Sequence, residues 1–189
     1  LSEGVPGTTL AIADSVVTGN VTAAAGGGVR AGGTSLTVTN SEITGNSAGG
    51  EGGGIWVDTT TGSLQMQLTG AAITGNHVGG EGDNGNGGGI YAITEGTGTN
   101  TATISGGTIS NNSAGGGGGG GGAGDDGSGG GIYLLEFDTG GTVTSSMTVN
   151  GTTLDENTAG GEGGDGTGSG GAISSGAWDL TLTGATASD

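Results

Sequence analysis

The sequence predicts an all-β solenoid, a parallel β-helix of about five to six coils that forms one domain over residues 1–189. Three observations support this prediction. An eleven-residue pattern recurs six times, apolar and polar residues alternate within it, and glycine-rich segments separate its copies. Such a repeat is one supersecondary unit, which buries its apolar side only by stacking on its neighbours.

The composition excludes several other classes of protein. Glycine supplies 54 of the 189 residues, which excludes a helical bundle because each helical glycine costs about 1 kcal/mol relative to alanine. The chain has no collagen-like G-X-Y period. A formal charge of -17 with Arg30 as the only cationic residue excludes a nucleic-acid binder, and the chain has no cysteine for disulfides or zinc. No apolar stretch approaches the roughly 18 residues that a membrane-spanning helix needs, so membrane insertion is not expected.

The eleven-residue units predict the first strand of each coil. They start at residues 10, 36, 66, 102, 147 and 180, so consecutive starts are 26, 30, 36, 45 and 33 residues apart. Positions one and three are apolar and positions two and four are mostly polar, which is typical of a half-buried strand. Position eight is apolar again in the five complete units. The apolar pairs at positions one and three are Leu10/Ile12, Leu36/Val38, Met66/Leu68, Ala102/Ile104, Met147/Val149 and Leu180/Leu182.

A second strand is predicted after each glycine-rich turn, where alternation resumes. Its first residues are Val29, Ile55, Ile90, Ile132 and Ile173. Coil length varies mainly between the end of the eleven-residue unit and this strand. We therefore expect glycine-rich loops inserted at one corner of the solenoid, where they leave the strand ladder intact.

Position eleven is asparagine in all five complete units. The five residues are Asn20, Asn46, Asn76, Asn112 and Asn157. An asparagine repeated at a coil corner can hydrogen-bond to its own turn and to the next coil, which predicts a structural amide ladder.

These motifs resemble a known family of bacterial proteins. The segment from Ile43 through Asn46 to Gly53-Gly54-Ile55 is similar to the repeat of polymorphic outer-membrane proteins and related right-handed β-helix surface proteins. The same motif recurs five times and covers nearly the whole chain. The resemblance implies a right-handed β-helix in a secreted, adhesive or structural passenger. The chain differs from the family in having Ile, Val or Leu where Phe is usual.

Two further columns predict surfaces. Trp56, Tyr91 and Tyr133 share the outward position of the second strand, and a row of exposed aromatics can contact a glycan or another protein. The alternative is that loops cover them. Interrupted threonine columns on the first strand, including Thr37 and Thr103, allow an ice-binding surface, although threonine is also simply a good exposed strand residue.

The sequence leaves calcium binding open. Acidic residues recur in the glycine-rich insertions, and carboxylates with backbone carbonyls are calcium ligands. Their spacing matches neither the EF-hand loop nor the nonapeptide calcium repeat, so diffuse screening of charge is the alternative. The candidate metal residues are Glu51, Glu81, Asp83, Asp125, Glu162 and Asp165.

We do not expect an enzyme. The acidic pairs are neighbours in sequence and diverge on a strand or turn, and Arg30 and His77 fall in different coils and columns. No nucleophile elbow or phosphate loop is evident. Neither end shows a capping element, so the domain is expected to be uncapped, or part of a longer chain or polymer.

The first functional hypothesis is a secreted, non-enzymatic structural subunit that stacks head-to-tail into an extracellular or cell-surface filament. The first alternative is an adhesin segment that binds a surface or glycan through Trp56, Tyr91 and Tyr133. The second is ice binding through the threonine columns.

Overall fold

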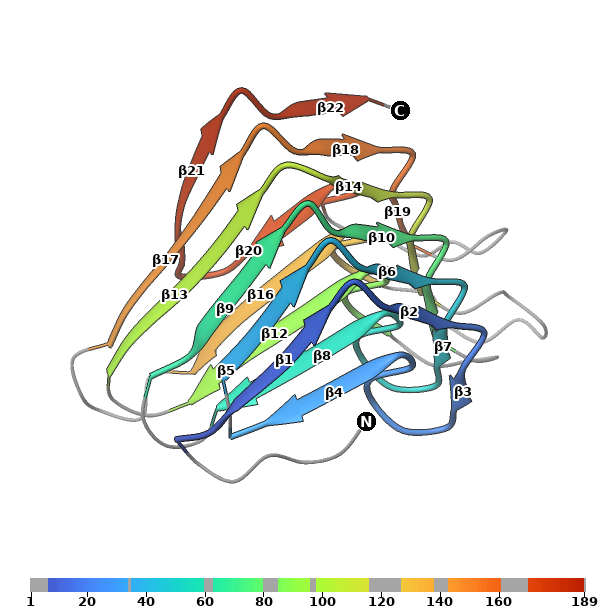
Figure 1. The fold of residues 1–189 in the computed structure, drawn as a ribbon, viewed down its shortest axis with the longest axis horizontal. Helices are drawn as coiled ribbons and strands as arrows, with labels where there is room; N and C mark the ends of the chain where they lie inside the picture. The colour runs from blue at the N-terminus through green and yellow to red at the C-terminus, as the bar shows by residue number, and fades with distance from the viewer. Residues whose placement is uncertain are drawn as a thin grey trace.

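The computed structural model describes residues 7–33, 35–59, 63–79, 85–95, 98–115, 127–137, 143–160 and 170–188. These residues form strands joined by turns, without a helix, and the strands assemble into four parallel sheets (Figure 1). The prediction of an all-β fold built from parallel strands is confirmed.

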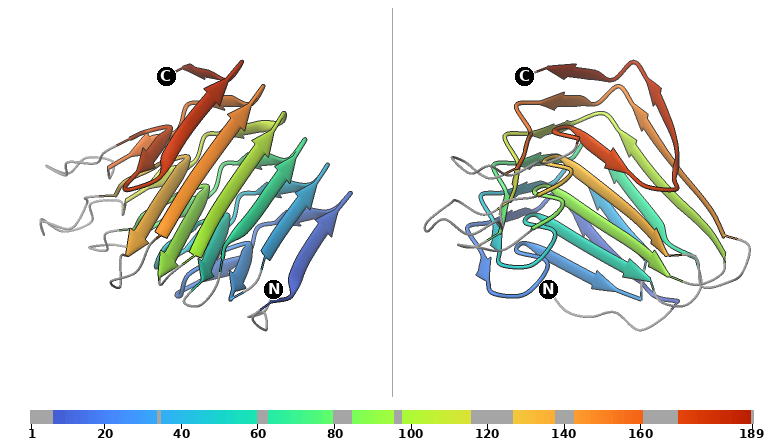
Figure 2. Two further views of the ribbon diagram at one scale, coloured as in Figure 1. Left: turned by 90° about the vertical axis from the view of Figure 1, so that its left-hand side faces the viewer. Right: turned by 180° about the vertical axis from the view of Figure 1, so that it is seen from behind.

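The chain passes through the four sheets in the same order each time, and each strand pairs with the strand four positions later. We name the sheets A to D in the order in which the chain reaches them, and we call one passage through them a layer. The described residues contain five layers with a strand in every sheet, followed by a sixth layer that has strands in sheets A and B. Figure 2 shows the layers stacked side by side from the N-terminal to the C-terminal end.

Sheets A and D contain the longer strands. Sheet A consists of β1 (Thr9–Ala13), β5 (Ser35–Thr39), β9 (Gln65–Thr69), β13 (Gly98–Ser105), β17 (Val143–Asn150) and β21 (Asp179–Thr183). Sheet D consists of β4 (Val29–Gly32), β8 (Ile55–Thr59), β12 (Ile90–Glu95), β16 (Ile132–Phe137) and β20 (Ile173–Ser175). These are the two strands per coil that the alternation predicts.

Sheets B and C contain strands of two or three residues. Sheet B consists of β2 (Val16–Thr18), β6 (Glu42–Thr44), β10 (Ala72–Thr74), β14 (Thr108–Ser110), β18 (Thr153–Asp155) and β22 (Thr186–Ser188). Sheet C consists of β3 (Val21–Thr22), β7 (Ser47–Ala48), β11 (His77–Val78), β15 (Ser113–Ala114) and β19 (Thr158–Ala159). The sequence did not predict them as strands, because two or three residues are too few to show an alternation.

The turn from sheet A to sheet B needs a left-handed residue at position five of every unit. Asp14 and Asn40 have φ of 47° and 45° there, and glycine stands at this position in the other four layers. Glycine, asparagine and aspartate are the residues that adopt this conformation most readily. The turn therefore depends on a sequence signal that runs through all six units: Asp14, Asn40, Gly70, Gly106, Gly151 and Gly184.

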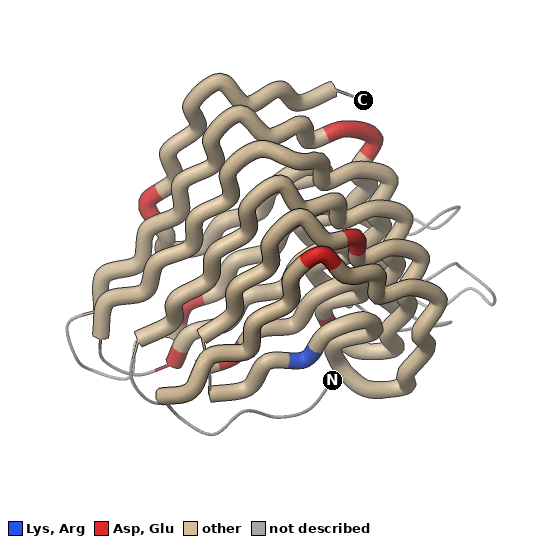
Figure 3. Tube along the Cα trace, in the orientation of Figure 1, with Lys and Arg blue, Asp and Glu red and all other residues tan. Residues whose placement is uncertain are grey.

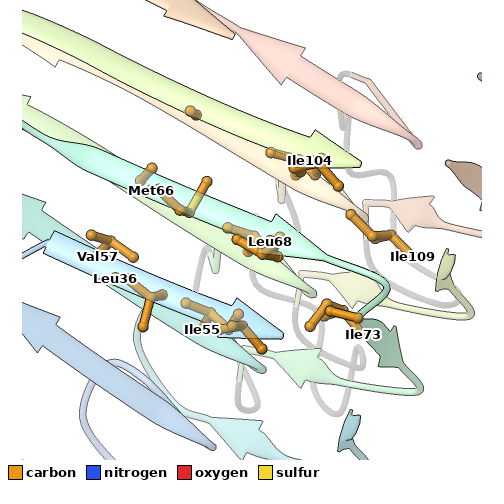
Figure 4. Packing of buried hydrophobic residues seen from close by; sticks show 14 of the residues in the cluster. Leu36, Ile55, Val57, Met66, Leu68, Ile73, Ile104 and Ile109 are labelled. Atoms are coloured by element: carbon orange, nitrogen blue, oxygen red, sulfur yellow. The ribbon is translucent and has the colours of Figure 1, made fainter. Parts of the chain in front are cut away.

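The apolar columns form one continuous core. Equivalent residues of neighbouring layers are paired in register, for example Leu36 with Met66 and Ile43 with Ile73. Side chains from sheets A, B and D meet between the sheets, as Figure 4 shows for Leu68, Ile73 and their neighbours. Alanine and valine residues of sheet C (Ala48, Val78 and Ala114) form a small second cluster.

The expectation that insertions lie at one corner needs a correction. The interval from the asparagine to sheet D varies, but so does the interval from sheet D to the next strand of sheet A: Val29 precedes Leu36 by 7 residues, and Ile132 precedes Met147 by 15. Part of the extra length lengthens strands in register, since Gly98 of β13 pairs with Val143 of β17. A longer layer is thus accommodated by longer ladders as well as by loops.

Candidate functional site

The five asparagines of position eleven form a continuous hydrogen-bonded ladder at the corner between sheets B and C. The side-chain Nδ2 of each donates to Oδ1 of the next asparagine, at 2.8 Å from Asn20, 3.0 Å from Asn46 and Asn76, and 2.9 Å from Asn112. The backbone N–H of the same residue donates to the same Oδ1. Every step of the ladder therefore joins two layers with two hydrogen bonds.

An inner ladder residue satisfies its whole amide. Oδ1 of Asn76 accepts from the backbone N and the Nδ2 of Asn46, both at 3.0 Å. Nδ2 of Asn76 donates to Oδ1 of Asn112 at 3.0 Å and to the carbonyl of Ile43 at 2.8 Å. Two donor hydrogens and two acceptor positions are all that this amide has. Asn76 can therefore be 1 % exposed without leaving a buried polar group unpaired.

A glycine pair precedes four of the five strands of sheet D and gives the ladder its space, and Gly171-Ala172 stands before β20. A Cβ on Gly54 would lie 2.9 Å from the Asn76 amide, and a Cβ on Gly89 would lie 3.0 Å from the Asn112 amide and 2.6 Å from the carbonyl of Gly131. Side chains cannot be accommodated at such distances unless the backbone moves. The asparagine of one layer therefore packs directly against the glycine pair of the layer before it, although the two motifs are separate in the sequence.

The aromatic row lies on the outer face of sheet D. Arg30, Trp56, Tyr91, Tyr133 and Ser174 occupy the same outward position in consecutive layers. The Arg30 guanidinium carbon lies 4.8 Å from the centre of the Trp56 ring, and the Tyr91 and Tyr133 rings stack at 5.4 Å with an interplanar angle of 12°. Trp56 and Tyr133 are half-buried, whereas Tyr91 is 6 % exposed.

This geometry limits what the aromatic row can bind. Ring faces of Tyr91 and Tyr133 are turned toward each other along the stack, so these faces cannot stack on a sugar at the same time. Burial, together with the nearby carboxylates of Glu51, Asp58 and Glu95, raises the pKa of the Tyr91 hydroxyl well above its usual value, which keeps that hydroxyl protonated.

Beside the aromatic row, further outward positions of sheet D are apolar in the third and fourth layers, next to Asp58 and Glu95. Ile93 pairs with Leu135 and both are half-buried, and Phe137, two residues further along β16, is 48 % exposed. These three residues were not predicted to form a surface. The signal was present in the sequence, because all three outward residues of β16 (Tyr133, Leu135 and Phe137) are aromatic or apolar, in addition to the inward Ile132 and Leu134.

Asp58 is the charged residue aligned with Ile93 and Leu135. One of its carboxylate oxygens, Oδ1, is buried and has no hydrogen-bond partner in the structure. Burial and the negative charge of Glu95 raise the pKa of this carboxyl, and the positive charge of Arg30 offsets part of the rise. Ionised Asp58 is therefore an unfavourable feature of the folded state at neutral pH.

The threonine columns lie on the outer face of sheet A. Thr37 is aligned with Gln67, Gln67 with Thr103, and Thr103 with Thr148 and Thr181, so a glutamine interrupts the row. Side chains here create a depression of about 430 Å³ across four strands. The face is thus polar, but it is not an unbroken plane of threonines.

Most of the candidate calcium ligands lie outside the described residues. Of the six candidate ligands only Glu51 is described, and its backbone carbonyl accepts a hydrogen bond from Gly26 N at 2.9 Å. Glu81, Asp83, Asp125, Glu162 and Asp165 are not described. Within the described ranges, no three His, Asp or Glu side chains lie close enough together to hold a metal ion.

Arg30 and His77 lie at different places in the structure and do not form a common site. Arg30 lies over Trp56 on the outer face of sheet D, and His77 lies in sheet C between Ser47 and Ser113. The His77 ring contacts the carbonyl of Gly79 at 2.9 Å.

No protein-family model, curated protein or solved structure matches the chain. The resemblance to the polymorphic outer-membrane proteins therefore rests on the motif residues alone. None of the described segments forms a helix that is long and apolar enough to cross a membrane.

Proposed function

We propose that the fold is a right-handed parallel β-helix whose layers are its coils, and that the chain is a secreted, non-enzymatic structural subunit. In this proposal it stacks head-to-tail with further copies into an extracellular or cell-surface filament. The handedness and the location rest on the resemblance of its motifs to those of bacterial surface proteins. The stacking rests on features of the described residues.

The observation that carries the proposal is the apolar end of the stack. Leu180 and Leu182 of the sixth layer are 38 % and 55 % exposed, while Met147 and Val149 directly beneath them are 1 % and 0 % exposed. Apolar side chains in core columns gain about 25 cal/mol for each Å² removed from water. A second copy that places Leu10 and Ile12 over them would continue the same columns.

The polarity of the asparagine ladder favours a head-to-tail contact. At the first layer, Oδ1 of Asn20 faces the open end of the stack, whereas at the other end Nδ2 and the backbone N–H of Asn157 face outward. One end therefore offers an acceptor and the other end offers donors. Unlike ends favour heterologous contacts, which propagate into filaments rather than closing as dimers.

The net charge of -17 acts in the same direction. Carboxylates on the sides of the stack repel other copies that approach laterally. Sheet A at the sixth layer carries the single carboxylate Asp179, at the start of β21 (Figure 3). The sixth layer thus presents one carboxylate on sheet A to an approaching copy.

Electron microscopy and sedimentation velocity of the purified chain test this proposal. We expect rods whose length is a multiple of one stack. The double variant Leu180→Thr/Leu182→Thr should shorten them, because it makes the apolar end polar. Leu135→Thr/Phe137→Thr is the matched control, since these side chains are half-buried and 48 % exposed on the outer face of β16, in an inner layer.

A monomer at every concentration, or equal assembly of both double variants, would contradict end-to-end stacking. A chelator arm separates the role of calcium: loss of rods in chelator would support cation binding by the acidic loop residues, and unchanged rods would argue against it.

A second candidate function is attachment to a surface through the outer face of sheet D. The specific observation is the exposure of Phe137 beside half-buried Leu135 and Tyr133. The triple variant Trp56→Ala/Tyr133→Ala/Phe137→Ala should abolish attachment if this face is adhesive. Attachment that is unchanged in a correctly folded triple variant would eliminate this candidate.

A further inference from the structure

The outer face of sheet A contains a trough that the proposed stacking does not use. It lies on the side of the stack, so it would remain open in a filament. Its volume is about 430 Å³. The residues that line it are Thr9, Ser35, Leu36, Thr37, Gln65, Met66, Gln67, Thr101 and Thr103.

The register of the strands gives the trough its direction. One wall is the outward row that contains Ser35, Gln65 and Thr101, and the other wall is the row that contains Thr37, Gln67 and Thr103. Leu36 and Met66 lie between the rows with their side chains buried, so backbone forms the floor. The trough therefore crosses the strands and runs along the stack over β1, β5, β9 and β13, which is about 14 Å at the usual strand spacing.

The two glutamines raise the walls. Gln65 and Gln67 are exposed, whereas the shorter side chains beside them, such as Thr37 and Thr103, are half-buried. The Thr101 hydroxyl donates to Oε1 of Gln65 at 2.6 Å, which leaves the Gln65 NH₂ group able to donate to a ligand. The amide of Gln67, in the opposite wall, offers both a donor and an acceptor to a ligand in the trough.

The chemistry of the lining indicates a neutral ligand. Every polar side chain in it is a hydroxyl or a carboxamide, although the chain as a whole carries a charge of -17. An anion would be repelled by the overall field, and a cation would find no carboxylate in the lining. Hydroxyls and amides that act as both donors and acceptors match a polyhydroxylated molecule.

We propose that this trough binds a neutral polysaccharide chain along the axis of the stack. A hydroxyl or carboxamide side chain lines the trough on each of its four strands, which suits a polymer with repeating hydroxyl groups better than a single sugar. A polysaccharide also fits this face better than ice does. The longer side chain of Gln67 stands between Thr37 and Thr103 in the same row, so the row is not flat. A glycan can lie between raised walls, whereas a flat crystal plane cannot.

Affinity electrophoresis of the full chain tests the proposal. Native gels would contain mixed-linkage β-glucan, dextran or mannan as neutral probes, and polygalacturonate as an anionic probe. We expect at least one neutral probe to retard the chain and polygalacturonate to leave it unaffected. Gln65→Ala/Gln67→Ala should weaken the retardation about tenfold, since each lost hydrogen bond is worth roughly threefold or more.

Thr148→Ala/Asn150→Ala is the matched control, on the same face in β17, outside the trough and not in the end strand, and should bind like the unmodified chain. All three chains should give the same circular dichroism, since the changed side chains are exposed. No retardation by any neutral probe, or equal retardation of both double variants, would overturn the proposal.

The variant Gln67→Thr separates a glycan from ice. It completes the row between Thr37 and Thr103, so it should weaken glycan retardation. Thermal hysteresis that is present in the unmodified chain and rises in Gln67→Thr, without glycan retardation, would overturn the proposal in favour of an ice-binding face. Assembly depends on the stack ends and not on the trough. A negative result in the gels would therefore leave the stacking proposal intact, and a chain that does not assemble could still bind the polysaccharide.

Discussion

The inner layers and the outermost layers are built from the same motif but differ in how much of it is buried. Val149 and Leu182 occupy one column, yet Val149 is 0 % exposed and Leu182 is 55 % exposed. Asn76 is buried with four hydrogen bonds, whereas Asn20 is exposed and its Oδ1 accepts none from the described ladder. A motif residue thus acquires its stabilising contacts from the layers above and below it.

Stability is therefore expected to be distributed unevenly between the inner and the outermost layers. In a repeat protein, stability is approximately a sum of terms for each layer and for each interface between neighbours. An inner residue contributes to two interfaces and an outermost residue to one. Matched substitutions in inner and outer layers should therefore have different costs, and four of them test the comparison.

The largest difference is expected between Asn76→Ala and Asn20→Ala. Removing the Asn76 amide takes the side-chain acceptor from the buried backbone N–H of Asn46. It also removes one of the two partners of Asn46 Nδ2, which still donates to the carbonyl of Val17, and the donor that Asn76 gives to the carbonyl of Ile43. Losing these three buried hydrogen bonds costs about 4 kcal/mol in unfolding free energy. Asn20→Ala should cost about 1 kcal/mol, because its partners can bond to water. Urea denaturation of both variants measures how much unfolding free energy each one loses. Equal losses would mean that the cost of removing a ladder asparagine does not depend on its burial.

A smaller difference is expected between Leu68→Ala and Leu182→Ala. Leu68 is 1 % exposed in the third layer, so its truncation leaves a cavity and should cost about 3 kcal/mol. Leu182 is half open to water and should cost less than about 1 kcal/mol. Thermal unfolding of the two variants provides the measurement. A large loss for Leu182→Ala in the unassembled chain would contradict the assignment of this residue to an open end.

The third pair exchanges glycine and alanine at one motif position. Gly89→Ala places a Cβ against the Gly131 carbonyl and the Asn112 amide and should cost about 2 kcal/mol. The fifth layer has Ala172 at the equivalent position, and Ala172→Gly should change stability by less than about 1 kcal/mol. Amide hydrogen exchange of the Asn112 side chain would show whether the ladder is displaced in Gly89→Ala. Unchanged exchange and stability would mean that the backbone shifts at no cost.

The smallest effect is expected from Asp58→Asn. Burial and Glu95 raise the pKa of Asp58 in the folded chain above its ordinary value of 3.8, so the folded state binds the proton more tightly than the unfolded state. The contribution of Asp58 to stability is therefore present below pH 3.8 and is lost as the pH rises through the raised folded pKa.

The carboxamide that replaces the carboxyl group in Asp58→Asn does not ionise. This variant should therefore raise the Tm at pH 7 by less than about 3 °C and should give no gain at about pH 3. Asp14→Asn, at an exposed corner of the first layer, is the control and should leave the Tm unchanged at both pH values. A gain that persists at the acidic pH would mean that the carboxylate charge is not the cause.

Much of the fold could be predicted because the relevant signals are local and repeated. Alternation predicted the strands of sheets A and D, and the apolar column through Ile43 and Ile73 marked sheet B without identifying it as a strand. Sheet C could not be predicted, since its strands have two residues and are defined only by their partners in other layers. The lengthening of β13 and β17 was also missed, because polar residues such as Ser145 extend those strands beyond the alternating core.

The candidate surfaces were predictable only in part. The sequence placed Trp56, Tyr91 and Tyr133 in one row, but it could not predict that ring faces within the row turn toward each other. Ile93, Leu135 and Phe137 were missed because an apolar residue on a strand is usually assigned to the core. The trough on sheet A depends on the height of Gln65 and Gln67 relative to side chains of other layers, which no single strand encodes.

The amino-acid sequence alone specified the class of strand, the identity of each column and the residues that can turn a corner. It did so because alternation and left-handed backbone preferences act within a few residues. The stacking of the layers specified which members of a column are buried, paired or exposed. That outcome depends on contacts between residues 26 to 48 positions apart, such as Asn20 with Asn46 and Asn157 with the carbonyl of Ile109. Such contacts form only when layers stack, so identical motifs acquire different roles at the centre and at the ends of the molecule.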